Sequence, residues 1–492
     1  MIKRSSGILM HITSLPGSYG IGTFGKEAYE FVDFLQKSGQ KNWQILPLGS
    51  TGYGDSPYQS FSAFAGNPYF IDLELLLKEG ILDEEYYENI DFGRDEERID
   101  FEKVFRLKMA VLKIAYEVGK DKFKEEIGKF KEENKDWLED YALYMAIKGL
   151  FDLKSWQEWP EDIRLRKAEA ISYYGKKLED EMNYWIFLQY LFLKQWKNLK
   201  NYANGKGIQI IGDIPIYVAE DSADAWANSK IFLFDEEKKP IKVAGCPPDF
   251  FSPTGQLWGN PLYRWDLLEE TGFDWWIKRI EESIKLYDIL RIDHFRGFES
   301  YWAIPHGEKT AVNGSWAKGP GMKLFNAIEA SLGTLDIIAE DLGFLTRDAI
   351  DFRVETSYPG MKVLQFAFDS SHDSDYLPHK HDKNCVVYTG THDNDTVYGW
   401  FEHSPKKEVD FAIKYLKLTE DEGYNWGFIR GAWSSTANLA MAQLQDFLGL
   451  GSMGRMNIPS TMGGNWLWRV KKEDLTDELA AKIYDMTKLY GR

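Results

Sequence analysis

The sequence predicts an α/β protein built on a (β/α)₈ TIM barrel with large, mainly helical insertions between the barrel strands. Short apolar runs that end in a polar cluster recur along the chain, and helical stretches separate several of them. Parallel barrel strands are covered on both faces, so they appear in a sequence as continuous apolar runs. A chain of 492 residues is also long enough for one such barrel with insertions.

Eight short runs are predicted to be the barrel strands. They consist mainly of apolar, often β-branched, residues and are followed by Gly, Pro, Asp or Asn. In chain order they are residues 7–11, 43–48, 208–213, 289–293, 336–340, 361–368, 385–389 and 452–456.

The interval between the second and third runs is too long for one crossover, and residues 75–205 are predicted to form a helical insertion. Residues 184–196 are apolar nearly all round, which is typical of a buried helix. No linker rich in Gly, Ser or Pro marks the edges of this segment, so we expect a subdomain within a single catalytic unit of residues 1–492. An apolar stripe with helical spacing supports the assignment and contains Phe101, Val104, Phe105, Leu112, Ala115 and Tyr116.

Residues 243–263 are predicted to form a long loop at the active site. Their prolines and glycines disfavour a helix or a central strand. Long loops in compact domains are frequently functional.

The composition favours a neutral substrate. The chain has 59 Lys and Arg against 77 Asp and Glu, a formal charge of −18, which disfavours nucleic acids and anionic membranes as partners. The two cysteines cannot form a disulfide framework, and no signal peptide or membrane span is recognisable, so we expect a cytoplasmic protein. The many aromatic residues (18 Trp, 27 Tyr and 30 Phe) include candidates for flat platforms that bind sugar rings.

Candidate reactive groups follow four of the predicted strands. A single Asp after a strand is usually a helix cap, but strand ends in a barrel meet at one mouth, where several carboxylates point to chemistry. The residues at these ends are Asp213, Arg291, Asp293, His294, Glu340, Asp341, His392 and Asp393.

Two of these carboxylates suit different roles. Arg291 and Asp293 are two residues apart and share a strand face, so we expect the cation to keep Asp293 ionised. Glu340 leaves an apolar strand, where burial raises a carboxyl pKa and favours a general acid. An ion pair within the barrel and a buried, paired Glu are the structural alternatives. One ionised and one protonated carboxyl are the requirements of retaining glycosyl transfer.

No metal and no cofactor is expected. Residues 371–383 are rich in possible ligands but lack the usual zinc spacings, and a solvated polar loop is the preferred interpretation. No phosphate-binding loop, dinucleotide fingerprint or nucleophile elbow lies in the required context. The possible ligands are His372, Asp373, Asp375, His379 and His381.

A series of short motifs, ordered along nearly the whole chain, resembles glycoside hydrolase family 77, the 4-α-glucanotransferases of the α-amylase clan. The motifs run from HITSLP at the N-terminal end to NWLWR at the C-terminal end. Between these two they are GDSPYQ (54–59), GDIPIY (212–217), residues 247–263, RIDHFRG (291–297), AEDLG (339–343) and residues 389–394.

The resemblance implies roles for the matching residues. Asp293 matches the nucleophile, Glu340 the general acid/base and Asp393 the transition-state stabiliser. The implied substrates are malto-oligosaccharides and α-glucans such as starch and glycogen, and a second glucan site near Tyr53 is a further implication. Residues matching substrate-binding positions are Tyr58, Asp213, Trp258, Arg291, His294, Asp341, Asp369 and His392.

One position departs from the family pattern. Ser460 stands where the family usually has Gly, and glycine often serves a positive φ or a close approach, so the local turn is the feature affected. Two other functions are compatible with the sequence: a retaining α-amylase-type hydrolase and a non-catalytic glucan-binding protein.

Overall fold

Eight parallel strands form the barrel of the computed structural model, which describes residues 2–52, 54–93, 95–248, 252–343, 345–369 and 373–492. Their order is β10-β11-β12-β1-β2-β3-β6-β9. The Ala339 N–H donates to Pro359 O at 3.0 Å, which connects the last strand of this order to the first. The strands are β1 (Ser5–Leu9), β2 (Asn42–Gln44), β3 (Gln209–Pro215), β6 (Ile289–Asp293), β9 (Ile337–Ala339), β10 (Gly360–Val363), β11 (Cys385–Tyr388) and β12 (Leu439–Gln443).

Seven predicted runs overlap barrel strands, and the eighth prediction is wrong. Residues 452–456 include a 3₁₀ turn (Ser452–Gly454), and the eighth strand is β12, which pairs with both β1 and β11. All five residues of β12 are buried. Its sequence, LAMAQ, has no β-branched residue and favours a helix. Pairing on both sides overrides that local preference.

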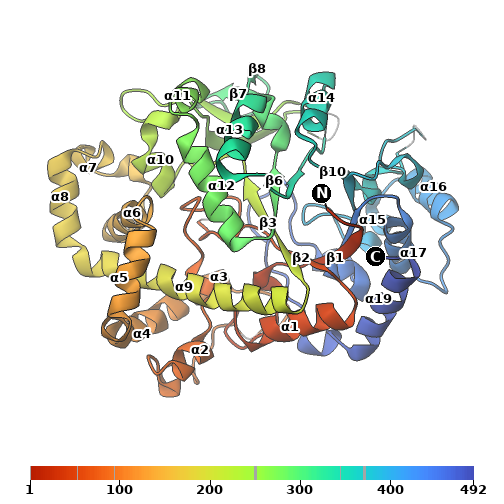
Figure 1. Cartoon of the computed structure of the whole chain (residues 1–492), viewed down its shortest axis with the longest axis horizontal. Coiled ribbons are helices and arrows are strands. Elements are labelled where there is room, and N and C mark those ends of the chain that lie inside the picture. Colours follow the sequence, from red (N-terminus) through yellow and green to blue (C-terminus); the bar gives the residue numbers. More distant parts are fainter. Residues whose placement is uncertain (1, 53, 94, 249–251, 344, 370–372) are drawn as a thin grey trace.

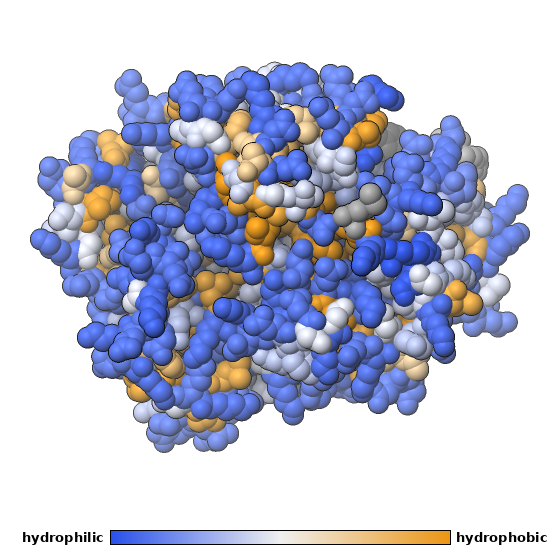
Figure 2. All heavy atoms as spheres, in the orientation of Figure 1, coloured by the Kyte–Doolittle hydropathy of each residue, from blue (hydrophilic) through white to orange (hydrophobic). Residues whose placement is uncertain are grey.

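The helices cover the strands on the outside (Figure 1). Outside the predicted insertion they are α1 (Lys26–Lys37), α10 (Ala223–Ala227), α11 (Trp265–Glu270), α12 (Asp274–Leu286), α13 (Met322–Leu332), α14 (Arg347–Thr356), α15 (Val397–His403), α16 (Lys406–Leu416), α17 (Tyr424–Ser434), α18 (Leu444–Leu448) and α19 (Asp477–Leu489). The face shown in Figure 2 is mostly hydrophilic, with apolar side chains gathered toward the middle of the view. Among the described residues, no helix combines the length and the apolar character needed to cross a membrane.

Residues 75–205 are largely helical, as predicted, and gather on one side of the barrel (Figure 1). The last helix, α9, connects this group to the barrel. Gln189 exchanges two hydrogen bonds with the backbone of Gly66, and Trp196 Nε1 donates to Leu286 O. The helices are α2 (Leu73–Lys78), α3 (Phe101–Lys103), α4 (Met109–Lys122), α5 (Lys124–Glu133), α6 (Leu138–Leu150), α7 (Glu161–Arg164), α8 (Ala168–Lys177) and α9 (Glu179–Gly205).

A π-helical turn, η4 (Val104–Lys108), changes the predicted apolar stripe. Phe105 was expected on the buried face but is 43% exposed, whereas Lys108 is fully buried. A π turn contains an extra residue, so side chains that follow the normal helical period rotate away from their expected face. The other five residues of the stripe are buried.

The segment 243–263 is not one loop, because it contains two antiparallel strands. These strands, β4 (Lys242–Cys246) and β5 (Gln256–Pro261), join β7 (Ser300–Pro305) and β8 (Ser315–Lys318) in a second sheet of order β5-β4-β7-β8. The proline ending β5 is tolerated because β5 is an edge strand. Trp258 lies on this edge strand.

Candidate active site

Asp293 and Glu340 lie side by side at the carboxyl ends of two paired strands. The register of β6 and β9 places Ile292 beside Ala339, so the residues that follow are neighbours. Glu340 accepts hydrogen bonds from the backbone N–H groups of His294 (2.6 Å) and Leu342 (2.8 Å). The Glu340 carboxyl is therefore fixed against the segment that carries Asp293.

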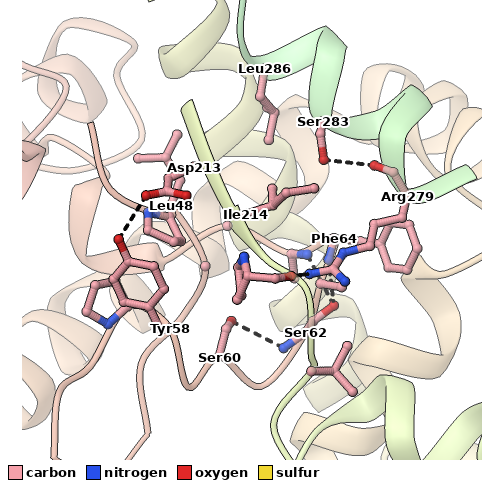
Figure 3. Close-up of a pocket in the computed structure, with 18 of the residues that line it drawn as sticks. Leu48, Tyr58, Ser60, Ser62, Phe64, Asp213, Ile214, Arg279, Ser283 and Leu286 are labelled. Atoms are coloured by element: carbon pink, nitrogen blue, oxygen red, sulfur yellow. Dashed lines mark hydrogen bonds between the residues drawn. The ribbon is translucent and has the colours of Figure 1, made fainter. Parts of the chain in front are cut away.

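A network of polar side chains connects Asp293 to Arg291, Asp213 and Tyr58. Arg291 forms an ion pair with Asp213 and contacts Asp293 Oδ1 through Nη2 at 3.1 Å. Tyr58 donates from its hydroxyl to Asp213 Oδ2 at 2.9 Å (Figure 3). Arg291 thus interacts with two carboxylates, Asp213 and Asp293, which the sequence analysis assigned to the ends of different strands.

Arg291 lowers the pKa of Asp293, as expected, but its effect is smaller than that of burial. Burial raises the pKa of Asp293 well above its ordinary value, the nearby carboxyl of Glu340 raises it further, and Arg291 only partly opposes the shift. Burial also raises the pKa of Glu340, as expected, against Arg291 and two backbone hydrogen bonds. The two carboxyls titrate as a pair. Repulsion between two neighbouring negative charges favours the state in which one carboxyl is ionised and the other is protonated.

Asp393 is held by residues that the sequence analysis missed. Asn457 Nδ2 donates to Asp393 Oδ1 at 2.7 Å, and Arg455 Nη2 donates to the Asp393 backbone carbonyl at 2.7 Å. His392 Nε2 lies 3.4 Å from the same carboxylate oxygen. Asn457 and Arg455 follow no observed barrel strand, but Asn457 comes directly after the predicted run 452–456, and this position was the available signal.

Aromatic rings line the predicted site. The ring of Tyr58 is stacked on His392 with centroids 5.1 Å apart, and Trp466 lies 6.0 Å from Tyr58. Trp258 meets His294 edge to face at 4.8 Å. His294 has a φ of +53°, a strained conformation of the kind found at functional sites.

Two further predicted residues, Asp341 and Asp369, interact with groups outside this network, and Asp341 also raises the pKa of Glu340. Asp341 pairs with Arg353 at 2.9 Å and accepts the Met361 N–H, so it connects β9, α14 and β10. Asp369 is exposed, and its charge acts on Glu408 of α16. Their substrate contacts remain predictions. Tyr53, near which a second glucan site was expected, lies outside the described residues.

The possible metal ligands of residues 371–383 have other partners. Asp373 forms an ion pair with Lys380, and His381 is buried between Ser435 Oγ and the Tyr376 carbonyl. Within the described ranges, no group of three or more potential ligands could hold a metal ion. His372 lies outside those ranges.

Ser460 has a φ of +64°. This position therefore has the positive φ that a glycine often serves, and the serine adopts it at some conformational cost.

A cavity of about 60 Å³ adjoins Tyr58 and Asp213 (Figure 3). It extends from the barrel end toward Arg279, Ser283 and Leu286 on α12. Asp213 Oδ1 is buried and has no hydrogen-bond partner among the described residues.

Known proteins resemble this chain in sequence and in fold. A sequence model of the 4-α-glucanotransferase family, glycoside hydrolase family 77, matches residues 10–476. A 4-α-glucanotransferase of Clostridium butyricum is 59% identical, covering 98% of this chain and all of the relative. One from Solanum tuberosum is 44% identical over all of this chain and 87% of the relative. The amylomaltase of Streptococcus agalactiae, solved with acarbose, is 46% identical with a TM-score of 0.97 over the whole of both chains. The chain therefore belongs to the 4-α-glucanotransferase family.

Proposed function

We propose that this protein transfers an α-1,4-glucan segment from a donor chain to the 4-hydroxyl of another glucan or of glucose, by a retaining double displacement. The main support is that Asp293 and Glu340 lie next to each other at the ends of two paired strands. Arg291 contacts both Asp293 and Asp213. One ionised and one protonated carboxyl side by side are what this reaction requires.

In the first step Asp293 attacks the anomeric carbon, and Glu340 gives its proton to the departing 4-oxygen. A covalent glycosyl-enzyme results, and the donor chain leaves with a new 4-hydroxyl. In the second step Glu340 removes the proton from the acceptor hydroxyl, which attacks the anomeric carbon and releases Asp293. Asp393 stabilises the oxocarbenium-like transition state, in which the sugar carries positive charge.

The remaining predicted residues are proposed to bind the sugar. Tyr58, His392 and Trp258 offer ring faces or edges beside the carboxylates. Asp213, Arg291, His294, Asp341 and Asp369 complete the proposed set. Malto-oligosaccharides and α-glucans are the proposed substrates, and acarbose in the related amylomaltase supports a site for an oligosaccharide.

Water competes with the sugar acceptor in the second step. Transfer exceeds hydrolysis only if the enzyme binds a sugar acceptor more favourably than water in the transition state. The same two carboxyls could hydrolyse glucan, so the products distinguish the two reactions.

A maltotriose time course tests the function. A ladder of longer oligosaccharides together with glucose indicates transfer, whereas net conversion to maltose and glucose indicates hydrolysis. Tight maltodextrin binding with no product would identify a non-catalytic binding protein.

Substitution of the proposed nucleophile tests the mechanism. Asp293→Asn is expected to lower kcat by roughly three orders of magnitude or more, because no other group forms the covalent intermediate. Unchanged circular dichroism would show that the variant is folded. Normal disproportionation of maltotriose by this variant would overturn the assignment.

Two broader expectations remain proposals. The cytoplasm is the proposed location, supported by the two unbridged cysteines. We also propose that residues 75–205 act as a subdomain of one catalytic unit, supported by the contacts of α9 with the barrel.

A further inference from the structure

A small cavity adjoins His392. About 10 Å³ of free space is lined by a set of residues that includes His11, His392 and Gln443. This is close to the smallest space that can hold one water molecule. Gln443 is 1% exposed, and its Oε1 has no hydrogen-bond partner among the described residues. A buried acceptor of this kind normally receives a hydrogen bond.

The tautomer of His11 is fixed by its backbone neighbour. The Leu46 N–H donates to His11 Nδ1 at 3.2 Å, so this nitrogen carries no proton. Burial, with a smaller contribution from His392, lowers the pKa of His11 to about 3. A neutral imidazole has one proton, which is therefore on Nε2. His11 consequently offers one N–H donor, and the residue lines the cavity.

His392 requires a particular tautomer. Burial lowers its pKa, so it also has a single ring proton at neutral pH. Its Nε2 is 3.4 Å from Asp393 Oδ1. A proton on Nε2 is attracted to the carboxylate, whereas a lone pair there is repelled. The Nε2–H tautomer leaves Nδ1 as an acceptor that needs a donor.

We propose that His11 is a positioning residue that fixes this tautomer through one water in the cavity. The water accepts the His11 Nε2–H and donates to Gln443 Oε1 and to His392 Nδ1. His392 then directs its Nε2–H to Asp393 and orients the carboxylate. This inference rests on the proposed function, because it assumes that Asp393 acts in the transition state.

The tautomer can be observed directly. Nitrogen NMR of enzyme labelled at histidine distinguishes protonated from unprotonated ring nitrogens, and a His392→Gln variant assigns the resonances. The wild type is expected to show His392 protonated at Nε2. His11→Asn is expected to populate the Nδ1–H form as well. An unchanged His392 tautomer in His11→Asn would overturn the proposal.

Two similar substitutions separate this role from a structural one. His11→Asn keeps an acceptor near the position of Nδ1, for the Leu46 N–H, but loses the distant donor. His11→Gln keeps a donor near the position of Nε2 but loses the acceptor. We expect kcat to fall about tenfold or more in His11→Asn, with a maltotriose KM within about twofold, and to stay within about threefold in His11→Gln. Equal losses, or a greater loss in His11→Gln, would indicate packing or the Leu46 bond instead.

A crystal structure provides the third measurement. One ordered water within hydrogen-bond distance of His11, His392 and Gln443 is expected, and a dry cavity would contradict the proposal. Asp393→Ala distinguishes this inference from the function on which it rests. If Asp393→Ala is inactive and His11→Asn is fully active, only the role of His11 fails. If Asp393→Ala is fully active, the role proposed for Asp393 fails.

Discussion

At the scale of single residues, the orientation of Asp393 depends on few contacts. Its side chain is 46% exposed, so packing alone does not fix it. Asn457 supplies the 2.7 Å hydrogen bond to Oδ1. Loss of a contact that positions a catalytic group lowers the rate strongly, since a displacement of that group by about 1 Å can reduce the rate about a hundredfold.

We therefore predict that Asn457→Asp lowers kcat roughly 10- to 100-fold at neutral pH. An ionised carboxylate at this position repels Asp393, whereas a protonated one can replace the amide donor. Consequently the ratio of variant to wild-type kcat should rise as the pH falls. Asn457→Ala, which has no donor at any pH, should show a constant ratio.

Asn384→Asp is the matched control. Asn384 is hydrogen-bonded to the Ser357 carbonyl just before the opposite end of β11, and the substitution adds the same charge. It should leave kcat and its pH dependence unchanged. If the Asn457→Asp ratio does not respond to pH, the proposed contact with Asp393 is not what the substitution disturbs.

At the scale of an element, the π turn η4 makes Lys108 an internal residue. Its Nζ donates to the Tyr69 carbonyl at 2.6 Å. Burial lowers the pKa of Lys108 to about 7, against a smaller upward effect of Asp72. The unfolded chain binds this proton up to a pH near 10, so between about 7 and 10 the unfolded state binds more protons than the folded state. Stability from this group therefore rises with pH across that window.

The free energy of unfolding should reveal this titration. Relative to Lys108→Met, the wild type is expected to gain up to about 1.4 kcal/mol per pH unit between pH 7 and 10. Urea unfolding at several pH values measures the difference. Lys124→Met, which alters an exposed lysine on α5, should give no such trend. A flat difference for Lys108→Met would mean that Lys108 has an ordinary pKa in the folded protein.

At the scale of the whole molecule, α9 joins the helical segment to the barrel. The Phe192 ring lies directly on Gly66, where an added Cβ would come within 2.2 Å of it, and its centroid is 5.2 Å from that of Phe24. Both segments contribute buried residues to one hydrophobic core. We infer that the helices and the barrel unfold together.

Phe192→Ala should accordingly reduce the stability of both parts. We expect a loss of about 3–5 kcal/mol, because the substitution leaves a cavity in a shared core. Far-UV circular dichroism, tryptophan fluorescence and activity should be lost in one coincident urea transition. Phe105→Ala, at the exposed side chain of η4, should change the free energy of unfolding by less than about 0.5 kcal/mol. Separate transitions for the two parts would refute a common unit.

The sequence by itself determined the barrel class, seven of its strands and the helical character of residues 75–205. These features depend on local apolar patterns, which survive without knowledge of the fold. The residues at the strand ends were also identifiable, since parallel strands bring their carboxyl ends together. Tertiary structure alone decided the strand β12, the buried position of Lys108 and the contact of Asn457 with Asp393. Each depends on neighbours far away in the chain. The same holds for the interaction of Arg291 with both Asp213 and Asp293. Pairing, burial and electrostatics between distant segments leave no periodic signal in the residues that experience them.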